Sequence, residues 1–522
     1  MLLGQVPFLC CVPRASPVRI VKQLTAAGYN ADREAVTLLA GAPDPDRAVE
    51  ALLDQIESET VTITAGEVRA VLNGATHRTD DTTVSGGGET STNRSKAAAS
   101  AAEVTGVEQA DQEASNRSPR DPAEPIVHGD MTGESTGTGE YEDFVSVFRD
   151  RYERLSAMLR GRVKHRPTDA LESMPGGAEG ALIGLVTDIR STRNGHWLVE
   201  LEDTNGTFPA LVMKDREFAS AVEELLLDEV IAVQGTLSDD GGILFVDDLF
   251  FPDVPRTFEP STADRHVQAA LVSDLHVGSQ EFLDGAWADF ADWLHSPAAD
   301  AVEYLLIAGD MVEGVGVYPD QDEELDIIDI YEQYEAFSER LKAVPGDMEI
   351  VMVPGNHDAV RLAEPQPAFE PELRKIMSAH DAHIYSNPST VTLEGVSILL
   401  YHGVSLDELV AELPMPEVSY DQPDQAMAQL LKKRHVAPKY GGKNRIAPEK
   451  QDYLVIEDIP DVVHSGHVHK LGVGAYNDVR LVNSGCFQGQ TAFQRSVNIS
   501  PDVGTAPILD LDTLEVTVRK FA

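Results

Sequence analysis

The first part of the chain has a helical hydrophobic pattern. Apolar residues recur every three or four positions between residues 16 and 74, for example at Val49, Leu52 and Ile56, and this spacing places them on one face of a helix. The pattern predicts a small helical domain at 16–74. Residues 1–15 are apolar but contain two prolines and no basic start, so we expect an unstructured start rather than an export signal.

The hydrophobic pattern disappears between residues 75 and 140. Glycine, serine, threonine and acidic residues dominate this stretch, and it offers few apolar side chains whose burial could offset the entropy of ordering the backbone. We therefore predict a flexible acidic linker at 75–140. A helical pattern returns at 144–162, within a predicted helical connector that spans 141–177.

Residues 178–256 alternate apolar and polar positions in five short runs separated by turn signals. A helical pattern at 214–228 separates the third run from the fourth. Three strands, a helix and two strands is the order of an OB-fold β-barrel, with a small β-sandwich as the alternative. OB barrels often bind single strands through aromatic and basic side chains. Because the candidate binding faces offer little beyond Arg190, Arg193 and Trp197, a structural role is favoured over DNA reading.

The last part of the chain, residues 266–522, repeats a pattern of strand, loop and helix. Each apolar run ends in aspartate, asparagine, histidine or glycine, as in the runs that end at Asp274 and Asp310. Buried strands with polar residues at their carboxyl ends are typical of catalytic α/β domains, because the site forms where the strands stop. We expect an α/β domain with a site at these strand ends.

Five of these strand ends carry groups that bind metal ions. They are Ser273-Asp274-Leu275-His276, Gly309-Asp310, Gly355-Asn356-His357-Asp358, Tyr401-His402-Gly403 and Gly466-His467-Val468-His469. Carboxylate, imidazole and amide oxygen suit Mn²⁺, iron or Zn²⁺, whereas the lack of thiolates argues against a structural zinc site. One such motif is weak evidence, but five in order predict a metal site. Asp358 either orients His357 or holds the loop, and His464 is interpreted as structural or as a support for the neighbouring ligands.

Charge and cysteine content bear on the environment of the protein. The net charge of −46 would repel a polyanionic substrate at low salt, but acid is spread along the whole chain. Such spreading favours adaptation to a salt-rich cytoplasm, where screening leaves local clusters to decide what binds. Three cysteines and no CxxC pair fit a reducing, intracellular compartment. No apolar run is long enough for a membrane span.

One segment of this acidic chain is basic. Between residues 432 and 450 only Glu449 is acidic, which suggests contact with a nucleic-acid backbone near the site. A solvated loop or a subunit contact is the alternative. The candidate DNA-binding residues are Lys432, Lys433, Arg434, Lys439, Lys443 and Arg445, with Lys450 at the end of the segment.

The motifs DLH, GD, GNHD, HG and GHVH, in this order, resemble the calcineurin-like metallophosphoesterase superfamily. The resemblance implies an α/β two-sheet sandwich with a dinuclear metal centre. It implies a first metal held by Asp274, His276 and His469, and a second held by Asn356, His402 and His467. It further implies that Asp310 bridges both metals, and that His357 acts on the phosphate without binding metal.

The order of the domains indicates a more specific family within this superfamily. A small helical domain, a linker, an OB barrel and a phosphoesterase domain together resemble the small subunits of archaeal family D DNA polymerases. This implies proofreading by a 3′→5′ exonuclease with two divalent ions, Mn²⁺ favoured. It also implies a large catalytic subunit and DNA as partners, contact with a sliding clamp through the holoenzyme, and a cytoplasmic, nucleoid-associated location. The alternatives are a free-standing repair nuclease or phosphatase, and a scaffold with a silent metal site.

Overall fold

The computed structural model divides the chain into two compact units, Met1–Glu103 and Val104–Ala522. It describes residues 30–31, 35, 38–39, 45–53, 62–63, 68–69, 71 and 120–522, apart from 136–138, 319–320, 378–380, 416–417 and 497.

In the first unit, the helix expected around Val49 is confirmed as α3 (Pro45–Leu53), with Val49 and Leu52 buried. A two-residue parallel pair, β1 (Asn30–Ala31) and β2 (Thr62–Ile63), was not predicted from the helical spacing. The predicted unstructured start and residues 75–119 of the predicted linker lie outside the described residues.

The predicted flexible linker extends too far, because residues 120–135 are an integrated part of the second unit. β3 (Ile126–His128) pairs antiparallel with β13 (Ser389–Leu393). Arg120 is buried, and its guanidinium lies 2.9 Å from the Asp347 carboxylate and also donates to two backbone carbonyls. Backbone pairing at a sheet edge and one buried arginine fix this stretch to the second unit. The linker was predicted from the scarcity of apolar side chains, and neither of these two contacts requires them.

The predicted barrel is a closed five-stranded barrel with the strand order β4-β5-β6-β8-β7, which excludes the small β-sandwich. It follows α6 (Tyr141–Leu159) and α7 (Thr168–Glu172), which form the predicted helical connector. Its apolar interior includes Leu182, Val199 and Ile231. The strands are β4 (Glu179–Ser191), β5 (Trp197–Glu202), β6 (Thr207–Val212), β7 (Val230–Leu237) and β8 (Leu244–Phe250).

The helix predicted at 214–228 is mostly wrong. Only a short 3₁₀ helix, η2 (Ala219–Glu224), forms there. Leu225 takes an extended backbone instead of continuing the helix, and it and Leu226 are buried. The backbone N–H of Leu226 donates to the Glu229 carboxylate at 2.8 Å, so a side chain replaces the helical hydrogen bond. The spacing of the leucines reflected burial against other elements rather than a long helix.

The rest of the second unit is built on two six-stranded sheets. The first has the order β12-β11-β10-β9-β18-β19, and the second β16-β17-β15-β14-β13-β3. The apolar runs of the sequence are confirmed as strands. The first sheet contains β9 (Gln268–Val272), β10 (Val302–Ala308), β11 (Glu349–Val353), β12 (His383–Ile384), β18 (Thr505–Asp510) and β19 (Val516–Lys520). The second contains β14 (Val396–Leu400), β15 (Val462–Ser465), β16 (Leu471–Tyr476) and β17 (Val479–Ser484), besides β13 and β3.

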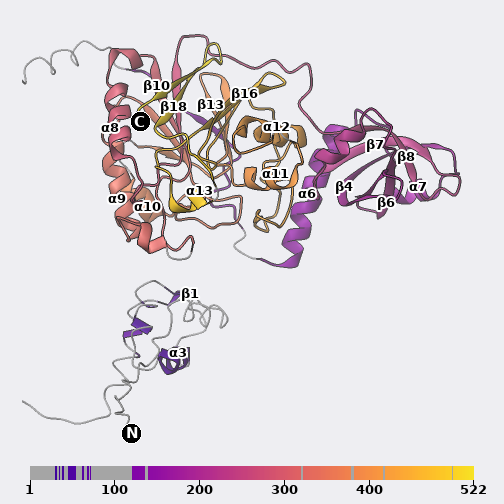
Figure 1. Cartoon of the computed structure of the whole chain (residues 1–522), viewed down its shortest axis with the longest axis horizontal. Helices are drawn as coiled ribbons and strands as arrows, with labels where there is room; N and C mark the ends of the chain where they lie inside the picture. Colours follow the sequence, from indigo (N-terminus) through magenta and orange to yellow (C-terminus); the bar gives the residue numbers. More distant parts are fainter. Residues whose placement is uncertain are drawn as a thin grey trace, which may run out of the picture. The chain divides into compact units, whose positions relative to one another are not determined.

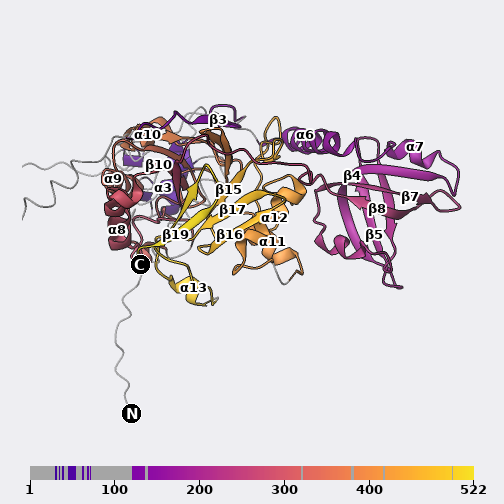
Figure 2. The same ribbon diagram turned by 90° about the horizontal axis from the view of Figure 1, so that it is seen from above.

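The sheets pack face to face, with helices on the two outer faces (Figures 1 and 2). Side chains such as Leu306 and Val351 of the first sheet meet Ile398 and Val462 of the second in one buried core. Separate apolar clusters join each sheet to its own helices. The first sheet is covered by α8 (Asp284–Leu294), α9 (Ile330–Leu341) and α10 (Pro371–Ile376), and the second by α11 (Leu406–Glu412) and α12 (Pro423–Lys433).

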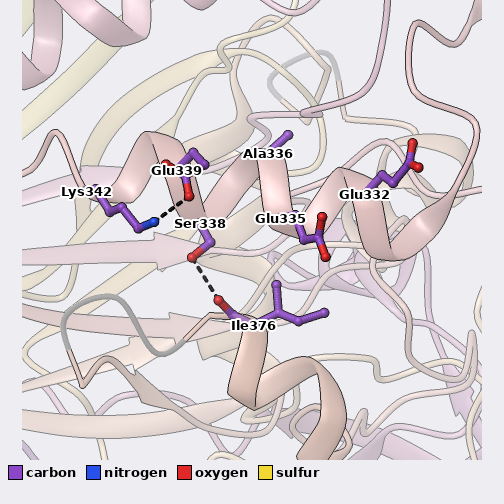
Figure 3. A pocket seen from close by; sticks show the side chains of 7 residues that line it. All are labelled: Glu332, Glu335, Ala336, Ser338, Glu339, Lys342 and Ile376. Carbon is purple, nitrogen blue, oxygen red and sulfur yellow. Dashed lines mark hydrogen bonds and ion pairs between the residues drawn. The ribbon is translucent and has the colours of Figure 1, made fainter. Parts of the chain in front are cut away.

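The outer side of α9 carries an acidic hollow of about 510 Å³. Glu332, Glu335 and Glu339 line it, and the Ser338 hydroxyl donates to the Ile376 carbonyl at 2.8 Å across it (Figure 3). Lys342 pairs with Glu339 there, whereas Glu332 and Glu335, three residues apart on the helix, repel one another unless salt screens them. This hollow contains none of the predicted metal-binding residues and fits the adaptation to high salt inferred from the composition.

A buried ion pair joins the barrel to the sandwich at the end of α12. The Lys433 ammonium lies 3.0 Å from the Glu229 carboxylate, and both side chains are buried. Lys433→Met would leave Glu229 without its charged partner, so we expect a loss of about 3–5 kcal/mol in the free energy of unfolding. Denaturant unfolding at fixed salt measures it. The double variant Lys433→Met/Glu229→Gln should recover much of the loss, and equal losses in both variants would contradict this explanation.

A second buried group, between α6 and the segment after α12, predicts sensitivity to acid. Arg151 and His435 both contact one oxygen of Asp452, at 2.7 and 2.9 Å. Burial, and then the charge of Arg151, lower the pKa of His435 to about 4. Its neutral ring accepts a hydrogen bond from the N–H of Ala437 and donates to Asp452.

Because the folded pKa of His435 lies below its ordinary value of about 6.5, the stability that it contributes is complete above that pH. We expect on the order of 3 kcal/mol to be lost as the pH falls from about 6.5 to 4. Denaturant unfolding across this range measures the slope, and His435→Gln should flatten it. An equally steep slope in His435→Gln would assign the effect to other groups.

Candidate metal centre

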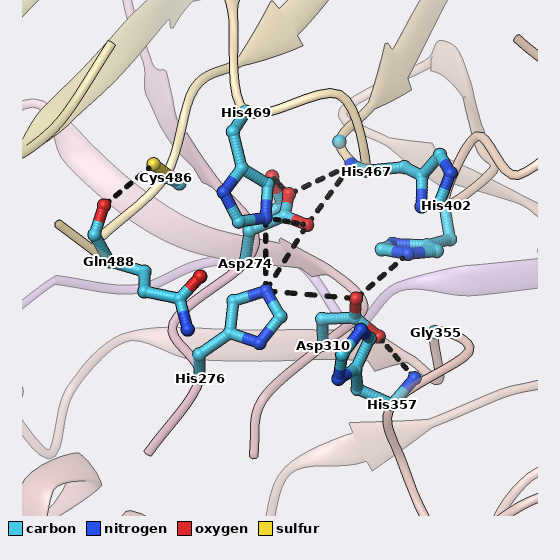
Figure 4. A network of polar contacts seen from close by, with 12 residues as sticks. Asp274, His276, Asp310, Gly355, His357, His402, His467, His469, Cys486 and Gln488 are labelled. Atoms are coloured by element: carbon cyan, nitrogen blue, oxygen red, sulfur yellow. Dashed lines mark hydrogen bonds and ion pairs between the residues drawn. The ribbon is translucent and has the colours of Figure 1, made fainter. Parts of the chain in front are cut away.

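The predicted metal-binding residues meet at one edge of the two sheets. In the first sheet β9, β10 and β11 are parallel, and in the second β14 and β15 are parallel. Parallel strands end at the same edge of a sheet, so the loops that follow them converge. The structure brings together Asp274 and His276 after β9, Asp310 after β10, His357 after β11, His402 after β14, and His467 and His469 after β15 (Figure 4). Asn356, also after β11, contacts His402.

The first group of donors is Asp274, His276 and His469. The Nε2 atoms of the two histidines are 3.0 Å apart. The Asp274 Oδ1 atom lies 3.4 Å from Nε2 of His469 and 3.8 Å from Nε2 of His276. All three side chains are buried. Two ring nitrogens and a carboxylate oxygen that face one another in a buried space form a donor set that suits a divalent cation.

The second group is Asp310, His402, His467 and Asn356. Three of its members, Asp310, His402 and His467, offer ligand atoms within 4.8 Å of one another. The amide oxygen of Asn356 lies 3.0 Å from Nε2 of His402. Asp310 Oδ2 lies 3.2 Å from Nε2 of His402 and 3.8 Å from Nε2 of His276 in the first group. One carboxylate therefore faces both donor groups.

The backbone around the cluster is unusual. Five donors have positive φ angles, a region that non-glycine residues rarely occupy and that is enriched at functional sites. Glycines allow the close approach: a Cβ on Gly355 would lie 2.3 Å from Asp310 Oδ1, and one on Gly466 would lie 2.3 Å from Asp274 Oδ2. The five angles are 53° at Asp274, 55° at His276, 51° at Asp310, 69° at His467 and 55° at His469.

Neighbouring groups orient the histidines toward the cluster. The Nδ1 atom of His402 lies 2.8 Å from the carbonyl of Ala308, and that of His276 lies 2.9 Å from the Glu313 carboxylate. Such partners fix the ring tautomer and leave Nε2 to bind metal. Glu313 was not singled out from the sequence. Its only signal is its position three residues after Asp310, and it is one of 87 acidic residues in the chain.

The electrostatics of the cluster attract positive charge. Burial disfavours the charged ring of His402, but the Asp310 carboxylate outweighs it and raises the pKa of His402 to about 9. Burial likewise opposes the charge of Glu313, but His276 lowers the pKa of that carboxyl to about 2. Two buried carboxylates that draw protons onto facing histidines can instead draw a metal ion, which displaces those protons on binding.

His357 occupies a different position from the donors. Its backbone N–H donates to Asp310 Oδ1 at 2.8 Å, and its ring Nδ1 lies 2.8 Å from the carbonyl of Glu313. The side chain is partly exposed and lines a cavity of about 850 Å³ that also contains residues of both donor groups. The contact at Nδ1 leaves Nε2 as the ring atom available to a substrate.

Asp358, the last residue of its motif, and His464, which precedes another motif, both have structural contacts. The interpretation that Asp358 orients His357 is wrong, because its carboxylate accepts from the N–H of Gly355 at 2.8 Å and from the Tyr334 hydroxyl at 3.0 Å. Burial raises the pKa of Asp358 to about 7. His464 is fully buried beside the hydroxyl of Ser484, in agreement with a structural role.

The basic segment divides into two parts. In the first, Lys432 pairs with Glu224, Lys433 with Glu229, and Lys439 with Glu408 and Glu412, while Arg434 donates to the carbonyls of Ile456 and Glu457. The predicted DNA contact is wrong for Lys433 and Arg434, because both are buried with these partners. In the second part, Lys443 and Arg445 are exposed. Lys443 lines the cavity of the cluster, 3.8 Å from Asp407. For Lys443 the DNA contact therefore stays a prediction.

The two-sheet part of the chain matches a known protein family. Residues 269–470, which contain every predicted donor, match the family of DNA polymerase alpha/epsilon B subunits. The class of protein indicated by this match is a subunit of a DNA polymerase.

Whole-chain relatives are more specific. The chain is 65% identical to the DNA polymerase II small subunit of Halobacterium salinarum, over 98% of this chain and 100% of the relative. It is 42% identical to that of Archaeoglobus fulgidus, over 73% of this chain and 77% of the relative. The chain therefore belongs to the family of archaeal DNA polymerase II small subunits, as its resemblance to the family D subunits predicted. Among the described residues, no helix is long and apolar enough to cross a membrane.

Proposed function

We propose that this small subunit is a metal-dependent 3′→5′ exonuclease that removes mispaired nucleotides for a large catalytic polymerase subunit. The observation that carries the proposal is the place of Asp310, whose Oδ2 faces His402 on one side and His276 on the other. A carboxylate between two buried donor groups suits a pair of divalent ions. DNA is the substrate, and a sliding clamp would be reached through the complete enzyme.

The proposed centre holds two divalent ions, with Mn²⁺ favoured. The first would be held by Asp274, His276 and His469, the second by Asn356, His402 and His467, and Asp310 would contact both. When bound, such a pair activates water at neutral pH and offsets the negative charge that develops on a phosphodiester during in-line displacement.

The other side chains handle the substrate. The Nδ1–H group of His357 donates a hydrogen bond to the carbonyl of Glu313. The Nε2 atom of the ring is therefore the one that can exchange a proton with the leaving oxygen. Lys443 at the cavity wall is placed to attract a phosphate. Glu313 holds His276 in position from behind.

Cleavage of a labelled primer tests the proposal. The chain is purified in molar salt, alone and together with its large subunit, and given a 5′-labelled primer with a mismatched 3′ end. We expect stepwise shortening from the 3′ end with Mn²⁺ and none with a chelator. Cleavage of small phosphodiesters but not of DNA would favour a free-standing phosphatase. A metal-free chain that cleaves neither and still binds the large subunit would favour a scaffold.

A further inference from the structure

An exposed aromatic side chain stands at the edge of the cavity that contains the metal centre. Twelve large apolar side chains of the described residues are exposed, and of these only Phe493 also lines this cavity. It is 68% exposed and belongs to the short helix α13 (Ala492–Ser496), which appears in yellow in Figure 2. Exposure of a phenyl ring to water is unfavourable, so its place beside the donors needs an explanation.

The helix that carries Phe493 is fixed to the cluster itself. The next residue, Gln494, is buried, and its amide nitrogen lies 2.9 Å from Nδ1 of His469. The amide oxygen of Gln494 accepts from the N–H of Thr491 at 3.1 Å, and the backbone carbonyl of Gln494 accepts from the N–H of Ile499 at 2.9 Å. These contacts hold the backbone on either side of Phe493 against a predicted metal ligand, so the position of the ring is tied to the position of the cluster.

We propose that Phe493 is a stacking platform for a nucleobase at the 3′ end of an unpaired DNA strand. The inference rests on the proposed function and adds a residue that selects its substrate. A phosphodiester that reaches His357 enters the same cavity that Phe493 lines, so the ring is one of the surfaces that its attached base can contact. Lys443 lines this cavity too and offers a cation to the backbone. An aromatic face combined with a basic group is the combination that binds single strands without sequence preference.

A protein surface is the less fitting partner for Phe493. A large-subunit surface seated on the ring would also cover the cavity through which DNA must reach the cluster. A flat base can cover the ring and leave its own phosphate inside the cavity. The ring accepts any of the four bases, because each has a π-face, as an exonuclease that removes any mispaired nucleotide requires.

A pair of substrates isolates the stacking. Two 5′-labelled single strands of the same sequence are used, one with a normal 3′-terminal nucleotide and one with an abasic residue there. Stacking on one aromatic side chain is worth about 5- to 150-fold per base. We expect the wild-type complex to prefer the strand with the base, and Phe493→Ala to bring the ratio of kcat/KM between the two strands close to one, mainly through KM. Phe493→Trp should restore the preference.

Control variants and binding separate the possible outcomes. Tyr331→Ala removes another exposed ring, on α9 and outside the cavity, and should keep the wild-type ratio. An equal loss on both strands in Phe493→Ala, or loss of the large subunit from the complex, would overturn the proposal. If the wild-type complex cleaves no substrate, the proposed function fails. The stacking proposal is then decided by fluorescence polarisation of the same two strands, where an unchanged ratio in Phe493→Ala overturns it.

Discussion

Asp310→Ala is expected to lose both bound metal and cleavage. The carboxylate faces both donor groups and is buried, so its removal would take one ligand from each of the two proposed ions and leave less negative charge to offset their mutual repulsion. Because metal ions contribute several kcal/mol to the transition state, cleavage should fall by at least about a thousandfold. Metal content of the purified variant and primer cleavage at saturating Mn²⁺ are the measurements.

A matched control for this variant is Asp292→Ala, which removes an exposed carboxylate on α8. It should keep both metal and activity. Both variants should still fold in the presence of salt, because Asp310 lies in a loop after β10 rather than in the apolar core, although the loss of the buried partner of His402 lowers the stability of Asp310→Ala. Full metal content in Asp310→Ala would show that this carboxylate does not bridge the two ions.

His357→Ala is expected to keep the metal and still lose turnover. The ring Nδ1 contacts the carbonyl of Glu313, and the side chain lines the cavity beside the cluster. Help from a general acid is worth roughly 10²- to 10⁴-fold, so kcat should fall in that range while metal content stays at the wild-type value. Metal analysis and single-turnover cleavage measure the two quantities.

The control for His357 is His383→Ala, because His383 on β12 pairs with Glu349 and belongs to neither donor group. It should behave as wild type in both measurements. If His357→Ala loses metal as completely as Asp310→Ala, then His357 is a ligand and its assigned role is wrong. The grouping of His357 with His276 and Glu313 within reach of one ion makes this a real alternative.

The strand-end donors could be predicted from the sequence because two signals coincide there. Each buried run stops at a residue with metal-binding chemistry, as at Asp274 and Asp310, and parallel strands bring their ends together. Glu313 and Phe493 carry no such signal. Glu313 resembles any other acid in an acidic chain, and the exposed Phe493 of the short helix α13 gains meaning only when the fold places it beside the cluster.

The basic segment shows why charge along the sequence is a weaker guide. Lys432 and Lys433 are neighbours in a positive run, but their partners, Glu224 and Glu229, belong to the barrel some 200 residues earlier. Nothing in the run itself separates a buried interdomain ion pair from an exposed cation such as Lys443, which lies 3.8 Å from Asp407. The C-terminal end of the linker could not be predicted from the sequence for the same reason, because the buried Arg120 pairs with Asp347, far along the chain.

The number of metal ions bound to the wild-type chain tests the account most directly. The protein is purified in molar salt, equilibrated with Mn²⁺, freed of excess metal and analysed by mass spectrometry of its metal content. Two ions per chain in the wild type, and fewer in Asp310→Ala, are the predicted result. A wild-type chain that retains no ion under these conditions would contradict the assignment of the buried histidines and aspartates to a metal centre.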